Sequence, residues 1–219
     1  MTHSLESVWE DREERIYPEM FGSEREGIFP LNRAMFKDVF GVKKADPRWL
    51  HLGVFAFAPS ETRNSWLYVT SGGSNPWDVE PEGYNEEGYS GLGVEFVLET
   101  PERENWAIIA LQRIFAYHVL CVLGYFGQNS GLAIGHRIPA GGSMDGKRSA
   151  LKVFAIAEPE TYKSVVVLPS GRFELLHCVG ITESERNFAK AHGTKVLVQK
   201  LRESGAFPIT NAKRKSLKV

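Results

Sequence analysis

The residues that could do chemistry are spread along the sequence rather than grouped in one motif. Ser71 or Ser74, in a Ser-Gly-Gly-Ser stretch, could act as a nucleophile if a histidine such as His136 accepted its proton. The sequence around them lacks the G-x-S-x-G elbow that leads into a helix. An enzyme would need this stretch, Glu95 and His136 to meet in one cleft. We keep such an enzyme as the alternative hypothesis and predict no catalytic residues.

Neither a phosphate-binding loop nor a metal site is predicted. The glycines of the same stretch could cradle a phosphate, but the Walker Gly-Lys-Ser/Thr ending is missing and Pro76 cannot donate an amide. His118 and Cys121 share one helical face, yet no third ligand is marked near them. His177 and Cys178 are adjacent in a strand pattern and must point to opposite faces. We therefore expect core residues, with no metal and no cofactor.

The stretch from residue 71 to residue 77 instead favours recognition of a partner. It forms a turn that carries Trp77, and tryptophan contributes much contact area at little entropic cost. Trp77 could equally fold back into the core. Residues 78–87 hold five acids and no base, and a protein partner with a positively charged groove could accept them. The predicted partner-binding residues are Ser71, Gly72, Gly73, Ser74, Asn75, Pro76, Trp77, Asp78, Glu80, Glu82, Glu86, Glu87, Glu95 and His136.

Patterned segments in the first half predict the elements that position this stretch. Ser7 and Glu10 have capping-box spacing, which predicts the start of a first helix. Residues 49–58 carry apolar side chains on both faces, which is typical of a central strand. Residues 66–70 look like its antiparallel neighbour. The prolines and glycines of residues 71–90 predict a long exposed loop.

The second half predicts a long helix followed by strands and two short helices. Thr100 and Pro101 give an N-cap and first-turn signal for an apolar helix that ends near Gly124. Arg113 lies near the middle of its apolar stretch, which argues against a membrane span and for a buried central helix. Thr182 has the spacing of a capping box for the first short helix. Strands are expected at residues 93–99, 132–138, 151–156, 165–168 and 172–179.

These elements predict an α+β fold: a mixed, mainly antiparallel β-sheet flanked by helices, with one long buried central helix. A single domain is expected over residues 1–219, with residues 1–27 as an N-terminal helical extension and residues 212–219 as a flexible basic tail. Two cysteines cannot make a disulfide framework and a signal peptide is not indicated, so we expect a cytoplasmic protein. The net charge of −1 argues against nucleic acid as a partner, and no membrane partner is expected.

Several short motifs occur in a distinctive order. They are Trp66-Leu-Tyr-Val-Thr-Ser-Gly-Gly-Ser-Asn-Pro-Trp77, Gly91-Leu-Gly-Val-Glu-Phe96, Glu104-Asn-Trp-Ala107 and Gly180-Ile-Thr-Glu-Ser-Glu185. This order resembles the suppressor-of-fused (SUFU) domain family over residues 28–214. The Thr-Ser-Gly-x-Ser-Asn-Pro turn together with the Gly-Ile-Thr-x-x-Glu segment makes the resemblance specific. The chain is short beside the animal relative and is similar to the bacterial stand-alone form.

The resemblance implies a binding module without catalysis. The animal member holds a transcription factor through an extended peptide segment, and bacterial relatives are inferred to be immunity proteins that neutralise polymorphic toxins. We therefore predict a cytoplasmic, non-catalytic protein-binding domain, with toxin neutralisation as its specific form. Its predicted partner is another protein, either a toxin or an extended peptide segment that adds to a sheet edge. A structural homo-oligomer is a third hypothesis.

Overall fold

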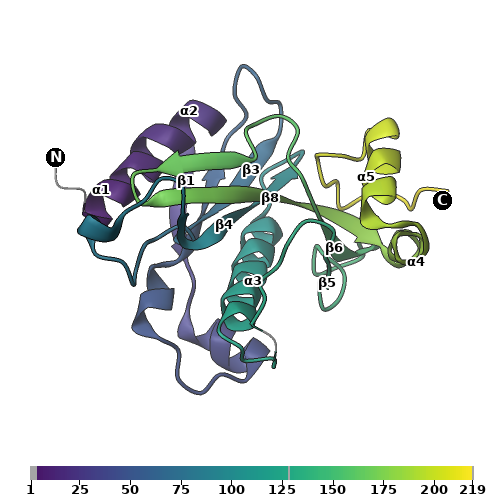
Figure 1. Ribbon diagram of the computed structural model, residues 1–219. Helices are drawn as coiled ribbons and strands as arrows, with labels where there is room; N and C mark the ends of the chain where they lie inside the picture. The colour runs from purple at the N-terminus through teal and green to yellow at the C-terminus, as the bar shows by residue number, and fades with distance from the viewer. Residues whose placement is uncertain (1–3, 128, 219) are drawn as a thin grey trace.

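The centre of the molecule is one eight-stranded β-sheet (Figure 1). The computed structural model describes residues 4–127 and 129–218. Across the sheet the order is β1-β2-β3-β4-β8-β6-β5, and β7 pairs with β8. Only the β4–β8 pair is parallel among the described strands, which confirms the predicted mixed, mainly antiparallel α+β fold. The strands are β1 (Arg25–Pro30), β2 (Gly53–Phe57), β3 (Trp66–Ser71), β4 (Tyr89–Thr100), β5 (Arg137–Pro139), β6 (Leu151–Ala157), β7 (Val165–Leu168) and β8 (Gly171–Thr182).

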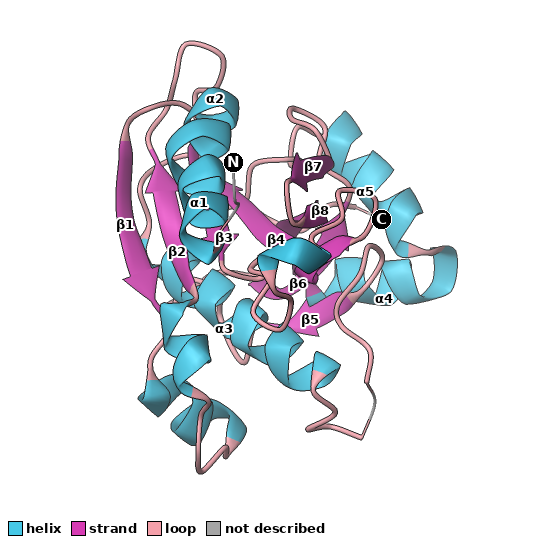
Figure 2. Cartoon of the chain, turned by 60° about the vertical axis from the view of Figure 1, so that its left-hand side comes forward, coloured by secondary structure: helices cyan, strands magenta, loops and turns pink. Residues whose placement is uncertain are grey.

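Helices cover both faces of this sheet (Figure 2). One face carries the long helix α3, and the other face carries the N-terminal helix on one half and α4 with α5 on the other half. The sequence of β2 explains this arrangement: Val54 and Ala56 pack in the α3 core, whereas Phe55 and Phe57 pack against the N-terminal helix. β2 is therefore the central strand that was predicted. The α-helices are α1 (Leu5–Glu10), α2 (Tyr17–Phe21), α3 (Asn105–Val122), α4 (Glu183–His192) and α5 (Thr194–Glu203). Two π-helical segments (Asp11–Ile16 and Met35–Val39) and two 3-10 helices (Pro47–His51 and Pro81–Gly83) complete the helical elements of the described residues.

Helix α3 is the buried central helix predicted from the sequence. By length and composition it could cross a membrane, with a mean hydropathy of 1.3, but 61% of its residues are buried in the fold. Its two central polar residues are accommodated differently. The Gln112 amide donates to the carbonyls of Phe29 and Pro30, and Arg113 is exposed. A core helix of a folded domain meets the same length and hydropathy criteria as a membrane span.

Two predicted helix starts were wrong: the first helix begins before Ser7, and α3 begins after Pro101. The first helix has Ser4 as its N-cap, and the hydroxyls of Ser4 and Ser7 accept from each other's amides. Ser7 thus closes the capping box at position N3 and is not its N-cap. The N-cap of α3 is Glu104. Thr100 instead ends β4, and its hydroxyl donates to the Glu102 carbonyl.

Two predicted strands are shorter than expected. Asp46 caps a 3-10 helix, Pro47–His51, so β2 begins only at Gly53. Trp49 consequently packs in the α3 core rather than on the opposite face. Residues 132–136 do not form a strand, because the Leu132 amide donates to the imidazole of His118 on α3. Only β5 remains of that predicted strand.

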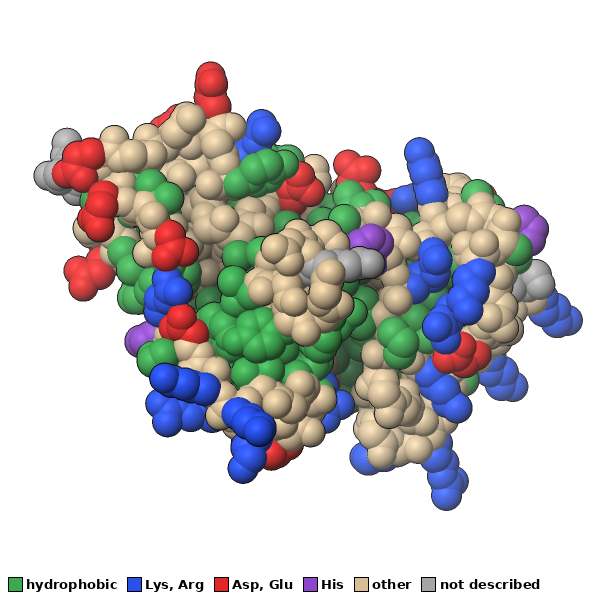
Figure 3. All heavy atoms as spheres, turned by 60° about the horizontal axis from the view of Figure 1, so that its bottom comes forward, with side chains coloured by type: hydrophobic (Ala, Val, Ile, Leu, Met, Phe, Trp, Pro, Cys, Tyr) green, Lys and Arg blue, Asp and Glu red, His purple; other side chains and the backbone are tan. Residues whose placement is uncertain are grey.

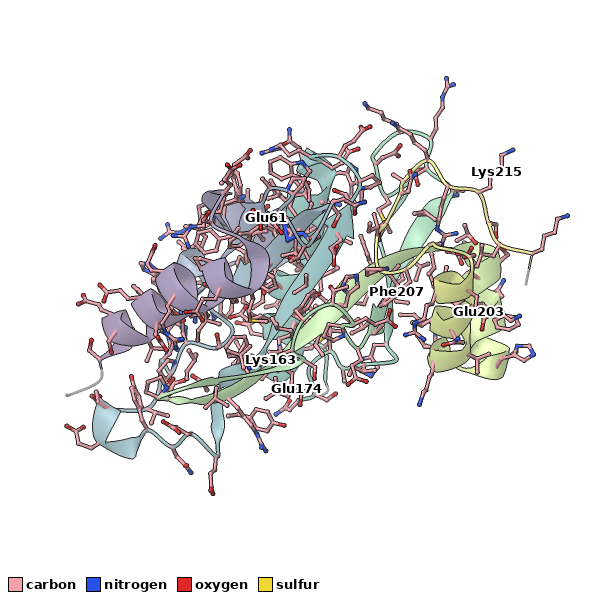
Figure 4. All side chains as sticks on the ribbon, turned by 90° about the horizontal axis from the view of Figure 1, so that it is seen from above. Glu61, Lys163, Glu174, Glu203, Phe207 and Lys215 are labelled. Carbon is pink, nitrogen blue, oxygen red and sulfur yellow. The ribbon has the colours of Figure 1, made fainter. Side chains whose placement is uncertain are left out.

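The C-terminal segment is attached to the fold through a buried ion pair. Both nitrogens at the end of the Arg214 side chain donate to the Glu185 carboxylate, each at 2.6 Å, and Glu185 is completely buried. Phe207 packs between the sheet and α5, whereas Lys215 extends outward (Figure 4). In the segment expected to be a flexible tail, Arg214 and the Leu217 amide both bond Glu185 of α4. Residues 1–3, Gln128 and Val219, which belong to the predicted single domain, lie outside the described residues.

Candidate functional site

Residues 71–76, here called the buried turn, lie inside the molecule. All six are buried, and exposure begins only at Asp78, so the predicted exposed loop over residues 71–90 was wrong in its first part. Gly73 explains the tight path: a Cβ at this position would lie 2.3 Å from the Val94 carbonyl oxygen and 3.1 Å from the Phe115 ring. The turn therefore fits between β4 and α3 only with glycine here.

Glu95 holds the buried turn from the β4 side. Its carboxylate accepts from the amides of Gly72 and Ser74 at 3.0 and 2.9 Å, and from the hydroxyls of Ser74 and Thr70 at 2.8 and 2.6 Å. Glu95 has no exposed surface. These four donors satisfy both oxygens of the buried carboxylate. The observed role of Glu95 is to fix the turn.

Arg12, on the N-terminal helix, holds the buried turn from the other side and was missed by the sequence analysis. Its guanidinium donates to the side chains of Ser71 at 2.7 Å, Ser74 at 2.9 Å and Asn75 at 2.7 Å, and it is 1% exposed. Glu13, at 2.9 Å, is its only carboxylate partner among the described residues. A signal was present: Arg12 lies four residues after Val8 and four before Ile16, on the apolar stripe of the helix.

Trp77 and the acidic residues that follow it lie at the surface end of this segment. Trp77 is half-buried and packs edge-on against Trp9, with ring centroids 5.8 Å apart, and its ring centroid lies 6.1 Å from that of His51. Asp78 accepts from Arg48 at 2.7 Å. Glu80, Glu82, Glu86 and Glu87 are exposed, and in the part of the chain described here none forms an ion pair.

His136 lies in a different part of the molecule. It precedes β5, and three strand spacings separate β5 from β4, so His136 and Glu95 are roughly 14 Å apart or more across the sheet. The cavity beside His136 is lined by neither Glu95 nor the buried turn. The cleft that the enzyme hypothesis required is therefore not formed by these residues.

His118, His177, Cys121 and Cys178 are buried core residues, whereas His51 and His192 are exposed. Burial lowers the pKa of His118 to about 4, and its Nδ1 accepts from the Leu132 amide at 3.0 Å. Burial also lowers the pKa of His177, which bonds Tyr162 and the Pro208 carbonyl. Burial raises the pKa of the Cys178 thiol. Residues 4–127 and 129–218 contain no group of three or more His, Cys, Asp or Glu side chains placed to hold a metal ion.

A cavity lies between α3 and β5, and we call it the α3–β5 groove. Its volume is about 840 Å³. Trp106, Ile109, Ile114 and Tyr117 of α3 form one side, and residues 135–141 together with Met144 form much of the other. On the face turned forward in Figure 3, hydrophobic side chains gather in a hollow with Lys and Arg side chains around it. Ile109 is 47% exposed although it belongs to the core helix.

The groove runs beside an open edge of the sheet. β5 is the last strand in the sheet order, and it pairs only with β6 among the described strands. His136 and Ala140 direct backbone bonds toward β6, so the alternation of an antiparallel ladder turns Arg137 and Pro139 outward. The Arg137 amide and the carbonyls of Arg137 and Pro139 therefore point away from β6, along the open edge of the sheet. Of the predicted partner-binding residues only His136 lines this groove. Sequence reasoning missed the rest, because an apolar helix and a short strand carry no binding signal when each is taken alone.

Comparisons with known proteins agree with this architecture. The family model for Suppressor of fused protein (SUFU) matches residues 48–215. A search of curated proteins gave no match. The Sufu-Fu complex structure is similar with a TM-score of 0.58 at 21% identity, covering 86% of this chain and 92% of that chain. Suppressor of Fused of Drosophila gives 0.60 at 19% identity, covering 88% of this chain and 52% of that one. A SUFU homologue from Neisseria gonorrhoeae FA 1090 gives 0.55 at 19%, covering 97% and 93%.

Proposed function

Since this chain belongs to the suppressor of fused family, we propose that it is a non-catalytic domain that binds another protein. A solved structure similar to this chain is a complex of Sufu with Fu. The proposal also draws on the separation of Glu95 from His136, which leaves the residues of the alternative enzyme hypothesis apart. The specific form that we propose is an immunity protein that neutralises a toxin in the cytoplasm.

The observation that carries this proposal is the α3–β5 groove beside a free strand edge. An extended segment laid along β5 could bond the outward amide of Arg137 and the outward carbonyls of Arg137 and Pro139. Alternate side chains of that segment would enter the apolar groove next to Ile109 and Ile138. Pro139 lacks an amide hydrogen, so it limits further pairing and protects the edge from unselective strand addition.

Ile109→Asp is expected to weaken partner binding at least tenfold, because an apolar side chain of the partner would then have to strip water from a carboxylate in the groove. Calorimetry with the purified products of the two genes flanking this one would supply the measurement. Val196→Asp is the matched control, since Val196 is 45% exposed on α5 and lies outside the groove. Equal weakening by both variants, or by neither, would contradict binding in the groove.

The surface end of the loop, with Trp77, is proposed as a second contact. The seven predicted binding residues Ser71–Pro76 and Glu95 are buried, so we assign them the role of holding this loop in place. The exposed acids Glu80, Glu82, Glu86 and Glu87 could approach a positively charged groove of a nuclease-type toxin. In this arrangement the loop guides association and the α3–β5 groove retains the partner.

Exchanging Glu80, Glu82, Glu86 and Glu87 for glutamine is expected to slow association about tenfold at low salt and much less at high salt. Stopped-flow mixing with the partner at several salt concentrations would measure this change. The control exchanges four exposed acids elsewhere, Glu61, Glu158, Glu183 and Glu203, which changes the net charge equally. Glu61 and Glu203 mark well-separated positions on the molecule (Figure 4). An equal slowing in the control would assign the effect to net charge alone.

A further inference from the structure

The two faces of β5 differ in their chemistry. Ile138 lies opposite Phe154 of β6, and Arg137 lies opposite Ala155. Phe154 packs in the α3 core and Ala155 in the α4–α5 core, so Ile138 faces α3 and Arg137 faces α5. The Arg137 guanidinium accordingly donates to the hydroxyl of Thr194, the first residue of α5. Any strand added beside β5 would direct its side chains alternately to these two faces.

The α5-facing side of β5 carries positive charge that no acid of the described chain neutralises. Arg137 donates to the Gly135 carbonyl and to Thr194, both uncharged. Lys195 follows Thr194 and is exposed. Among residues 4–127 and 129–218, neither Arg137 nor Lys195 forms an ion pair. This side is therefore suited to an incoming carboxylate.

The α3-facing side is apolar in its middle. Ile138, Phe154, Ile109 and Ile114 all line the groove. The one acid that lines it, Asp145, already accepts from backbone amides: Oδ1 bonds Lys147 at 2.9 Å and Ser149 at 3.0 Å. Arg113 of α3 also lines the groove and is exposed. The middle of this side is therefore the part suited to apolar side chains.

We infer that the segment bound along β5 alternates apolar residues, directed into the α3–β5 groove, with acidic residues, directed to Arg137 and Lys195. This inference rests on the proposed function and names the chemistry of its partner. A carboxylate beside a guanidinium forms the stronger, charge-assisted kind of hydrogen bond. The period-two alternation follows from strand geometry, because neighbouring side chains of an added strand cannot face the same side.

Selection from a displayed library of random decapeptides on the immobilised protein tests this alternation. The selected sequences are expected to be enriched in Asp or Glu at every second position, with apolar residues between them. The same selection on Arg137→Gln is expected to lose at least half of the acidic enrichment and to keep the apolar one. Arg137→Lys is expected to restore part of the acidic enrichment. Lys190→Gln, an exposed cation on α4, is the control that should change nothing.

The outcomes separate this inference from the proposed function. Groove-dependent peptides without acidic enrichment, or with acids that persist in the Arg137→Gln selection, would overturn the inference and leave the proposed function standing. Peptides that bind Ile109→Asp as well as the unchanged protein would overturn groove binding itself. Arg137 also contacts Thr194, so thermal melting checks that Arg137→Gln folds. If that variant does not fold, Lys195→Gln takes its place, because Lys195 is exposed, and it is expected to lower the acidic enrichment by a measurable fraction.

Discussion

Arg12→Ala is expected to lower the free energy of unfolding by about 3–5 kcal/mol, the range measured when one partner of a buried charged network is removed. Arg12 is 1% exposed and is the shared donor for Ser71, Ser74 and Asn75. Its removal leaves these polar side chains buried without that donor and creates a cavity, and both effects destabilise the folded state. Urea unfolding followed by tryptophan fluorescence would measure the change.

Two further variants separate the effect of the Arg12 hydrogen bonds from the effect of its charge and from that of an exposed arginine on the same helix. Arg12→Lys keeps the charge, but one ammonium group cannot reproduce the planar fork that reaches three side chains, so we expect a loss of more than about 1 kcal/mol. Arg15→Ala removes an exposed ion pair with Asp11 one turn along the helix and should cost about 0–1 kcal/mol. A loss below 1 kcal/mol for Arg12→Ala would show that the N-terminal helix contributes little to the buried turn.

Arg214→Ala is expected to destabilise the protein by a similar amount, about 3–5 kcal/mol, because it leaves the Glu185 carboxylate buried without its cation. Lys215→Ala, on an exposed neighbour, is the control and should change stability by less than about 0.5 kcal/mol. If Arg214→Ala unfolds like the unchanged protein, the ion pair does not hold the C-terminal segment. Deletion of residues 212–219 would remove Arg214 as well, so it cannot serve as a simple test of tail charge.

The pH dependence of stability gives an independent readout of this pair. Burial alone would raise the pKa of Glu185, but hydrogen bonds from Arg214 and from the Leu217 and Thr182 amides outweigh burial and lower that pKa. A carboxyl group with a lowered folded-state pKa contributes stability at a pH above its unfolded value, and this contribution is lost as the pH falls through the folded value. We therefore expect the difference in stability between the unchanged protein and Arg214→Ala to shrink in acid. A difference that grows in acid would contradict this assignment.

The Ser-Gly-Gly-Ser-Asn-Pro motif has a structural role in this protein. Its glycines and proline predicted an exposed loop, but residues 71–76 are buried. It joins the N-terminal helix, β4 and α3 through Arg12, Glu95 and the close approach of Gly73 to Phe115. The family model matches residues 48–215, so the arginine that completes the network lies outside the matched range. The motif that made the resemblance specific thus includes the buried turn, which contacts the N-terminal helix, β4 and α3.

The sequence by itself determined the elements whose signals are local. The apolar residues on both faces of β2 and the capping box at Thr182 and Glu185 were predicted as observed. The strand predicted at residues 165–168 is β7, with the same bounds. These features depend on neighbours two to four positions away, so spacing alone records them.

Only the tertiary structure decided which residues meet across the fold. Arg12 and Ser74 are 62 positions apart, and Arg214 and Glu185 are 29 apart, so no spacing rule connects them. The α3–β5 groove likewise needs Ile109, which looks like a core residue in an apolar helix, to lie beside a three-residue edge strand. Burial and edge position arise from how the elements pack, and a single sequence does not encode them as a local pattern.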